Sequence, residues 1–188
     1  MQLAPIIAEI ERRAEGRAIG RLQEVRKDLK KLARLATNSI FSSQTIFEDQ
    51  GYAYHHGGRS EMQFNVGTDL PGMFRHGVAF SFEPSRSLPN PEEALLTSVR
   101  RFNEFIELYS NMYSDMSMWE WYRGDRRYSD RALVPIRADL IRRGMFLFMG
   151  KLQPLATLDC NLIVEDLDRL VPLYEFVEGH EEFPRTEP

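Results

Sequence analysis

A polar segment at residues 55–67 carries side chains that could do chemistry. It reads HHGGRSEMQFNVG, with two histidines, an arginine, a glutamate and two carboxamide residues near a Gly57–Gly58 pair. Glycine tolerates the positive φ angles of a tight turn, so the pair predicts a β-hairpin. Three polar residues then alternate with three apolar ones: Glu61, Gln63 and Asn65 with Met62, Phe64 and Val66. This alternation predicts a half-buried strand whose polar face could bind or react.

A second segment, at residues 119–128, reads WEWYRGDRRY and combines four large aromatic residues with three arginines. Aromatic faces stack on nucleic-acid bases and arginines bind phosphates, a combination that suits an extruded base. The predicted DNA contacts are Arg59, Arg123, Arg126 and Arg127 for phosphates, Trp119, Trp121 or Tyr122 for stacking, and Glu61, Gln63 and Asn65 for the base edge. The alternative is that Trp119 and Trp121 pack on one strand face while the arginines coat a turn.

Two enzymatic alternatives involve a metal ion. Asp49, Glu61 and Gln63 partly match the PD-(D/E)xK nuclease pattern, in which carboxylates on adjacent strands hold Mg²⁺. Gln63 stands where that pattern has a lysine. Glu61 could instead join His76 and one of the adjacent histidines, since neighbouring strand residues point to opposite faces. Neither a P-loop nor a G-x-G-x-x-G motif occurs, so no cofactor is expected unless a nuclease site binds Mg²⁺.

Composition and charge limit the class of protein. The 188 residues contain no apolar run long enough to cross a membrane and no signal-peptide pattern. Cys160 is the single cysteine, which excludes a disulfide framework within the chain and favours the reducing cytoplasm. Its neighbour Asp159 should raise its pKa, which does not favour a nucleophile. The net charge of −4 counts against strong non-specific DNA binding, because phosphate neutralisation dominates such affinity.

The charge is unevenly distributed. Residues 1–34 carry nine Lys or Arg against five Asp or Glu, whereas residues 158–188 carry two against nine. The acidic, proline-bearing end at residues 179–188 predicts a tail or a linker to a further domain.

The hydrophobic patterns predict the elements that must position these residues. Helical spacing covers residues 5–36, interrupted by Gly16 and Gly20, and strand patterns fill residues 39–82 as a three-stranded antiparallel meander. Further elements are a helix from Pro91 capped by Asn90, a strand at 116–122, a short helix from Pro135, a central strand at 145–149 and a helix at 161–177 divided by Pro172. The predicted buried stripe of the helix after Asn90 is Leu95, Leu96, Val99, Phe102, Ile106 and Tyr109.

The predicted fold class is α+β, a mixed and mostly antiparallel sheet with an N-terminal helical arm and helices packed on the sheet. The expected organisation is an arm at residues 1–36, a single α+β domain at 37–178 and the acidic tail at 179–188.

Three stretches resemble a known group of proteins. HHGGRSEMQFNVG, FRHGVAFSFEPSRSLP and LVPLYEFVEG are similar to N-terminal regions that precede HNH nuclease domains in bacterial restriction-type enzymes, and the resemblance spans most of residues 50–178. It implies a specificity module that reads DNA, with a modified or flipped base as a candidate target, and cleavage by a following nuclease domain. The HNH signature itself is absent, so the resemblance implies no catalytic residue.

The sequence therefore favours a DNA-binding specificity module of a restriction or defence nuclease, with DNA as its partner and without membrane association. The alternatives are the metal-dependent nuclease and a protein-interaction domain. In the last case the N-terminal helix would pair with a partner, for instance a second copy of the chain.

Overall fold

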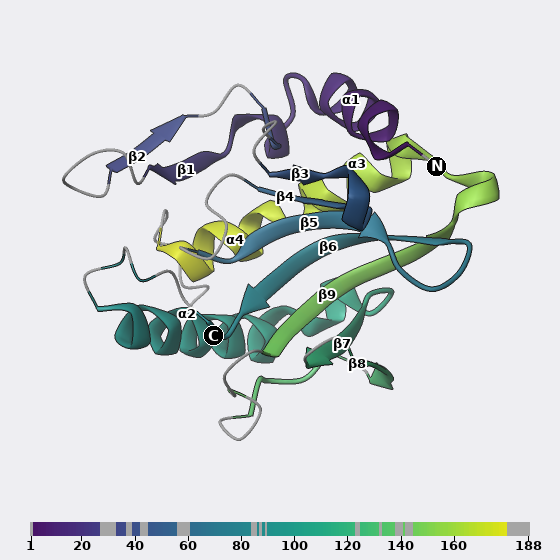
Figure 1. The fold of residues 1–188 in the computed structure, drawn as a ribbon. Helices are drawn as coiled ribbons and strands as arrows, with labels where there is room; N and C mark the ends of the chain where they lie inside the picture. Colours follow the sequence, from purple (N-terminus) through teal and green to yellow (C-terminus); the bar gives the residue numbers. More distant parts are fainter. Residues whose placement is uncertain are drawn as a thin grey trace.

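The computed structural model shows an α+β fold built on one large antiparallel sheet (Figure 1). It describes residues 2–26, 33–36, 39–41, 45–55, 61–83, 86, 88, 90–122, 125–131, 133–137, 141 and 145–179. Seven strands form the sheet in the order β3-β4-β5-β6-β9-β7-β8, and β1 and β2 form a separate hairpin. All pairings between the described strands are antiparallel, which confirms the predicted fold class.

The elements follow the chain in this order. The helices are α1 (Leu3–Ala14), α2 (Pro91–Tyr109), α3 (Cys160–Arg169) and α4 (Val171–Glu178). The strands are β1 (Gln23–Arg26), β2 (Ala33–Ala36), β3 (Ile46–Phe47), β4 (Tyr52–Tyr54), β5 (Gln63–Thr68), β6 (Met73–Ser81), β7 (Ser117–Tyr122), β8 (Asp125–Arg131) and β9 (Met145–Pro154).

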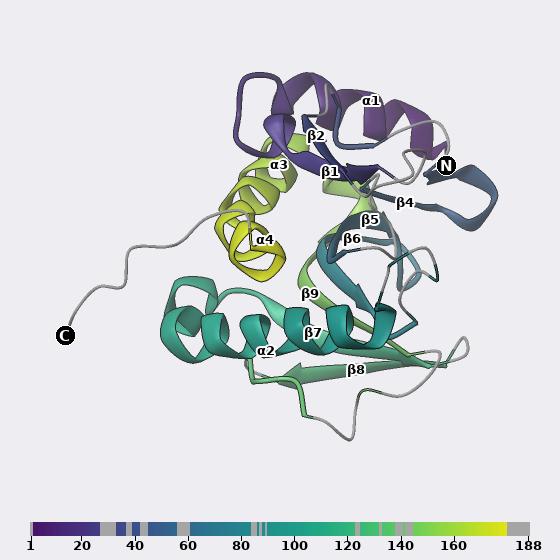
Figure 2. The same ribbon diagram turned by 90° about the vertical axis from the view of Figure 1, so that its left-hand side faces the viewer.

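One face of the sheet packs against helices, and we call it the helix-covered face (Figure 2). Phe64 of β5 meets Tyr174 of α4 with ring centroids 5.4 Å apart. Phe80 of β6 meets Phe102 of α2 edge-on at 5.2 Å. These pairs belong to the main hydrophobic core. The opposite face contacts none of the described helices in this way, and we call it the helix-free face.

The predicted N-terminal helix is correct only over α1. Its chain continues as η1 (Ile19–Arg21) and then as strand β1, so the prediction of a helix to residue 36 was wrong. The helix ends because Gly16 adopts φ 77°, a left-handed conformation that turns the chain back. The apolar residues at helical spacing after Gly16 therefore do not continue the helix.

Helix α1 is part of the core and does not project as an arm. Its residues Leu3, Ile7, Ile10 and Ala14 are buried, and the helix packs on α3. Glu48, in the 3-10 turn Glu48–Gln50, accepts hydrogen bonds from the backbone N–H groups of Leu3 and Ala4 at the helix start. The apolar stripe that suggested pairing with a partner is thus already used within the chain.

The remaining predictions were mixed. The meander, the central strand β9 and the division of the last helix at Pro172 are confirmed. Leu96 was wrongly assigned to the buried stripe of α2, since it is 51% exposed. Residues 133–137 are not helical, and strand β8 was missed. Asn90 precedes α2 but does not cap it by a side-chain bond.

Candidate nucleic-acid interface

The predicted DNA contacts fall into three groups. Arg59, Arg123 and the Gly57–Gly58 turn lie outside the described residues. Strands β7 and β8 give the backbone positions of Trp121, Tyr122, Arg126 and Arg127. The structure describes the side chains of Glu61, Gln63, Asn65 and Trp119.

The strand registers bring several of these positions to the helix-free face. One row across five strands is Gln63, Ala79, Phe148, Trp119 and Tyr128. The rows beside it are Asn65, Gly77, Gly150 and Ser117 on one side, and Ser81, Phe146, Trp121 and Arg126 on the other. Residues paired across antiparallel strands share a face, so positions far apart in sequence meet on one surface. The register positions of Tyr122 and Arg127 fall on the other face.

The predicted solvent-facing polar edge of β5 is buried, which corrects the sequence interpretation. Gln63 is 3% exposed and Asn65 is 6% exposed, while Phe64 on the other face is fully buried. Strand β5 lies inside the sheet between β4 and β6, and residues on both of its faces are buried. The polar and apolar residues that alternate along β5 therefore face two different buried environments. Polar residues can occupy such a position when neighbours satisfy their hydrogen bonds.

Arg75 of β6 supplies the hydrogen bonds for Asn65. Its Nε and Nη2 donate to Asn65 Oδ1 at 3.2 and 3.0 Å. Its Nη1 donates to the carbonyl oxygen of Thr68 at 2.6 Å, and its guanidinium lies 5.9 Å from the centre of the Phe148 ring. The amide of Asn65 is thus held in place by a buried arginine that the sequence analysis did not select.

Trp119 is a packing residue. It is 2% exposed, and its ring lies 4.4 Å from that of Phe148, with Ala79 in the same small cluster. The alternative that Trp119 packs on a strand face is therefore confirmed, and direct stacking of Trp119 on a base would require its displacement.

Glu61 does not share the face of Gln63 and Asn65. Its Oε1 lies 3.3 Å from His55 Nδ1, and both side chains are fully buried. The His55 ring meets Tyr174 of α4 edge-on at 5.5 Å, which places the pair on the helix-covered face. Strand β5 begins only at Gln63, so the alternation of the strand does not extend to Glu61.

The predicted nuclease residues are not brought together. Asp49 is exposed in the 3-10 turn before β4, beside the Thr68 end of β5, where Thr68 N–H donates to the Gly51 carbonyl. Glu61 precedes the other end of that strand, so roughly 20 Å of extended chain separates the two carboxylates. The described residues contain no group of three His, Cys, Asp or Glu that could hold a metal ion.

His76, the third member of the predicted histidine site, belongs to an ionic network that the sequence analysis missed. Its Nε2 lies 2.9 Å from Asp166 Oδ2, and Asp166 Oδ1 accepts from Lys151 Nζ at 2.7 Å. Asp115 pairs with Lys151 at 2.6 Å and with Arg169 at 3.0 Å. The members come from β6, β9, α3 and the turn after η4 (Ser110–Tyr113), so no sequence spacing could have indicated them.

The network shifts the pKa values of Asp115, Asp166 and Lys151. Hydrogen bonds from Arg169 and Lys151 outweigh desolvation and hold the pKa of Asp115 well below its usual range. Burial opposes ionisation of Asp166, but His76 and Lys151 more than offset it, so its pKa is lowered. Burial likewise opposes the charge on Lys151, while its two aspartates raise its pKa overall. These pKa shifts favour the charged forms of Asp115, Asp166 and Lys151, and the ion pair of Lys151 with Asp166 fastens α3 to the sheet.

Cys160 has the direction of pKa shift that the sequence predicted. Burial raises the pKa of the thiol first, and the carboxylates of Glu9 and Asp159 add to the shift. A thiol so protonated is a poor nucleophile at neutral pH.

A cluster of three aromatic rings at the edge of the sheet was also missed. Phe47 stacks on Tyr52 at 5.0 Å and on Tyr54 at 5.6 Å, with interplanar angles of 18° and 19°. All three side chains are half-buried. Strands β3 and β4 put them on the helix-free face, because Tyr54 pairs with Asn65 and Tyr52 with Gly67. The spacing of Tyr52 and Tyr54 by two residues could have predicted that their rings share one face of a strand. Phe47 joins them only through the pairing of β3 with β4.

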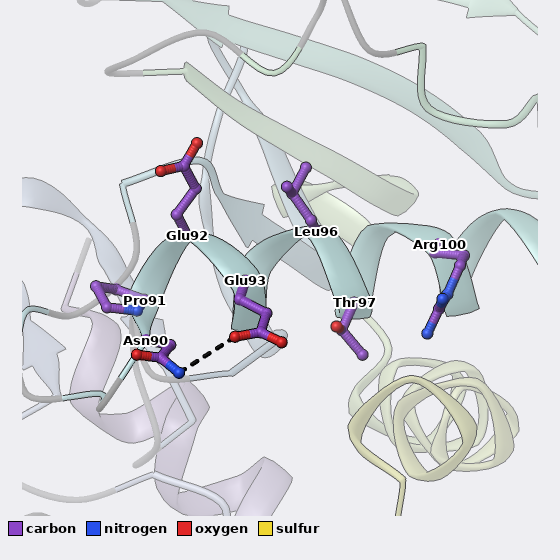
Figure 3. Close-up of a pocket in the computed structure, with 7 residues that line it drawn as sticks. All are labelled: Asn90, Pro91, Glu92, Glu93, Leu96, Thr97 and Arg100. Carbon is purple, nitrogen blue, oxygen red and sulfur yellow. Dashed lines mark hydrogen bonds between the residues drawn. The ribbon is translucent and has the colours of Figure 1, made fainter.

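A shallow hollow of about 810 Å³ lies elsewhere, along the first half of α2. Figure 3 shows its lining residues along this one helix, with Asn90 bonded to Glu93 at 3.2 Å. The lining includes Leu96, Thr97 and Arg100 and none of the predicted DNA contacts.

The chain matches no family model, no curated protein and no solved structure. The resemblance to regions preceding HNH nuclease domains therefore stays a prediction. None of the described helices is both long and apolar enough to span a membrane.

Proposed function

We propose that the chain is a DNA-binding specificity module that uses the helix-free face of its sheet. The observation that carries the proposal is the strand register. It gathers Gln63, Asn65, Trp119 and the backbone positions of Trp121 and Arg126 on one surface, although they come from distant segments. Five of the ten positions predicted from chemistry alone thus share a face without a described helix over it.

The burial of Gln63, Asn65 and Trp119 assigns them a supporting role in this proposal. They form the floor of the face, where Arg75 holds Asn65 and Phe148 packs on Trp119. In this proposal, partly exposed side chains at the margin of the face contact the base. A module that reads one base can function with few phosphate contacts, which is compatible with a net charge of −4.

The nuclease alternative is the weaker candidate. Glu61 is buried against His55, and Asp49 lies beyond the other end of β5. The protein-interaction alternative also loses its predicted surface, because the apolar stripe of α1 is buried.

The test is a binding experiment with the purified chain. The probe is a pool of fluorescently labelled oligonucleotides with randomised sequence, offered both as duplexes and as single strands, at two salt concentrations. We expect saturable binding with a shallow dependence on salt, because log K falls by about 0.9 per contacted phosphate for each tenfold change in salt. We also expect no cleavage when Mg²⁺ or Mn²⁺ is added.

Two results would contradict the proposal. One is the absence of binding to any member of the pool. The other is metal-dependent cleavage that disappears in Glu61→Gln, which would favour the nuclease alternative.

A further inference from the structure

We infer that the outer surface of α2 is an interface at which two copies of this chain form an antiparallel, two-fold symmetric dimer. The inference goes beyond the proposed function and does not rest on it. Helix α2 packs on the helix-covered face, where Phe102 meets Phe80. Its outer surface and the helix-free face therefore lie on opposite sides of the sheet, and a dimer formed through α2 leaves the proposed DNA-binding face uncovered.

An unbroken row of exposed side chains follows α2 into the 3-10 turn behind it. Its members are four residues apart, so consecutive members are neighbours on the helix surface. The row consists of Glu92, Leu96, Arg100, Glu104, Leu108 and Met112, all of them exposed. Figure 3 shows its first half, Glu92, Leu96 and Arg100. Leu96, Leu108 and Met112 are 51%, 62% and 65% exposed, the highest values for large apolar side chains in the described part of the chain. Such a concentration of exposed apolar side chains on one helix is typical of an interaction surface.

The order of charges along the row identifies a second copy as the partner. When the two-fold axis passes midway between Arg100 and Glu104, Arg100 of one copy faces Glu104 of the other, and Leu96 faces Leu108. The same patch then serves both copies, as a two-fold interface requires. A shift by one helical turn places either Arg100 against Arg100 or Glu104 against Glu104, and a parallel pairing does both. Because like charges in contact oppose association, the charges select this one register.

The geometry of helix packing permits this pairing. Rows of residues four apart run obliquely across a helix, and two such rows interdigitate when the helices cross at about 50°. The two Arg100–Glu104 pairs then lie at the centre of the crossing, with the leucines on either side. The other exposed carboxylates of the helix, Glu93 and Glu107, lie outside the row. A single helix pair buries a small area, so the dimer is expected to be weak and concentration-dependent.

The test measures the mass of the purified full chain by sedimentation equilibrium, at concentrations from about 1 µM to about 1 mM. The monomer has a mass of 21.9 kDa. Arg100→Glu and Glu104→Arg each give the centre of the row two charges of one sign. Leu108→Ala tests the apolar contact, and Leu162→Ala, which truncates a leucine of α3 that is 50% exposed, is the matched control. Thermal unfolding followed by circular dichroism checks that each variant is folded.

We expect the parent to change from monomer to dimer within this concentration range. Arg100→Glu or Glu104→Arg alone should raise the dimer dissociation constant about tenfold or more, because the two copies then present like charges. An equimolar mixture of these two variants should dimerise as the parent does, since each copy again faces the opposite charge. Contacts within one chain cannot produce this rescue. Leu108→Ala should weaken the dimer several-fold, and Leu162→Ala should not change it.

Cysteine cross-linking tests the direction of pairing. In a Cys160→Ser background, a mixture of Leu96→Cys and Leu108→Cys should form a disulfide-linked dimer under mild oxidation. Leu96→Cys by itself should not, because the antiparallel register separates residue 96 of the two copies by roughly 18 Å of helix, far beyond the reach of a disulfide.

The inference is wrong if the parent stays monomeric throughout the concentration range, and the DNA-binding proposal is then unaffected. It is equally wrong if the parent dimerises and both charge variants dimerise as tightly, because the interface then lies elsewhere. Cross-linking of Leu96→Cys to itself but not to Leu108→Cys would overturn the antiparallel arrangement.

Discussion

The two faces of the central sheet both contain buried residues, but the contacts described on them differ. The helix-covered face is buried by rings and aliphatic side chains from elements distant in sequence, such as Tyr174 against Phe64. On the helix-free face, residues of neighbouring strands contact one another, as when Phe148 packs on Trp119 and Arg75 donates to Asn65. Among the described residues, these contacts join distant elements on the first face and neighbouring strands on the second.

The two faces also handle charge differently. On the helix-covered face, Asp166 joins His76, Lys151 and Arg169 from three separate elements. On the helix-free face, Arg75 donates hydrogen bonds to Asn65 and to the carbonyl oxygen of Thr68 on the adjacent strand. The first arrangement joins elements that are distant in the sequence, whereas these hydrogen bonds of Arg75 join two neighbouring strands. The following predictions test this difference.

Asp166→Ala should have the largest effect, because it leaves the buried His76 and the partly buried Lys151 without the carboxylate between them. Removal of one partner from a buried ionic network typically costs about 3–5 kcal/mol in the free energy of unfolding. Urea unfolding measures this loss. Glu9→Ala, which removes the surface ion pairs with Arg12 and Arg13 on α1, is the control and should change the unfolding midpoint little. Equal effects of the two variants would contradict a fastening role for the network.

Trp119→Ala should cost about 3–5 kcal/mol of stability, because Trp119 is a buried ring packed on Phe148. Tyr52→Ala should cost clearly less, since Tyr52 is half-buried at the sheet edge. Thermal and urea unfolding of both variants measure the two losses. A Trp119→Ala protein as stable as the parent would contradict the packing role of this ring.

Gly77→Ala should destabilise the sheet by about 1–3 kcal/mol, the usual cost of overpacking. A Cβ at Gly77 would clash with the carbonyl oxygen of Met149 and lie 2.7 Å from Cα of Gly150. Ser117→Ala, in the same row but exposed, is the control and should change stability little. If the two unfolding free energies agreed, the close approach of β6 and β9 would not constrain the sheet.

Acid should weaken the helix-covered face gradually, because the pKa values of Asp115 and Asp166 are lowered in the fold. Their stabilising contribution is complete above the unfolded value of about 4 and is lost as the pH falls below it toward the depressed folded values. Asp115→Asn should therefore flatten the slope of unfolding free energy against pH between about 4 and 2. Met112→Ala, an exposed neighbour without a titrating group, should keep the parent slope. Identical slopes in parent and Asp115→Asn would be evidence against these ion pairs.

The sequence by itself determined the elements whose signals are local. The alternation of polar and apolar residues predicted β5 and β6, and the apolar run at 145–149 predicted the central strand β9. Pro172 predicted the break between α3 and α4. Local signals also failed where they competed. Helical spacing extended the first helix past Gly16, but a glycine at positive φ ends a helix whatever follows it.

Only the tertiary structure decided which polar residues are accessible. The alternation at Gln63 and Asn65 shows that the two sides of a strand differ, but exposure depends on what lies beside the strand, and here it is Arg75 and Phe148. In the same way, four segments meet in the Asp166 network and two strands complete the ring cluster of Phe47, Tyr52 and Tyr54. Such groupings arise from contacts between residues far apart in the chain, and no spacing within the sequence encodes which of them will meet.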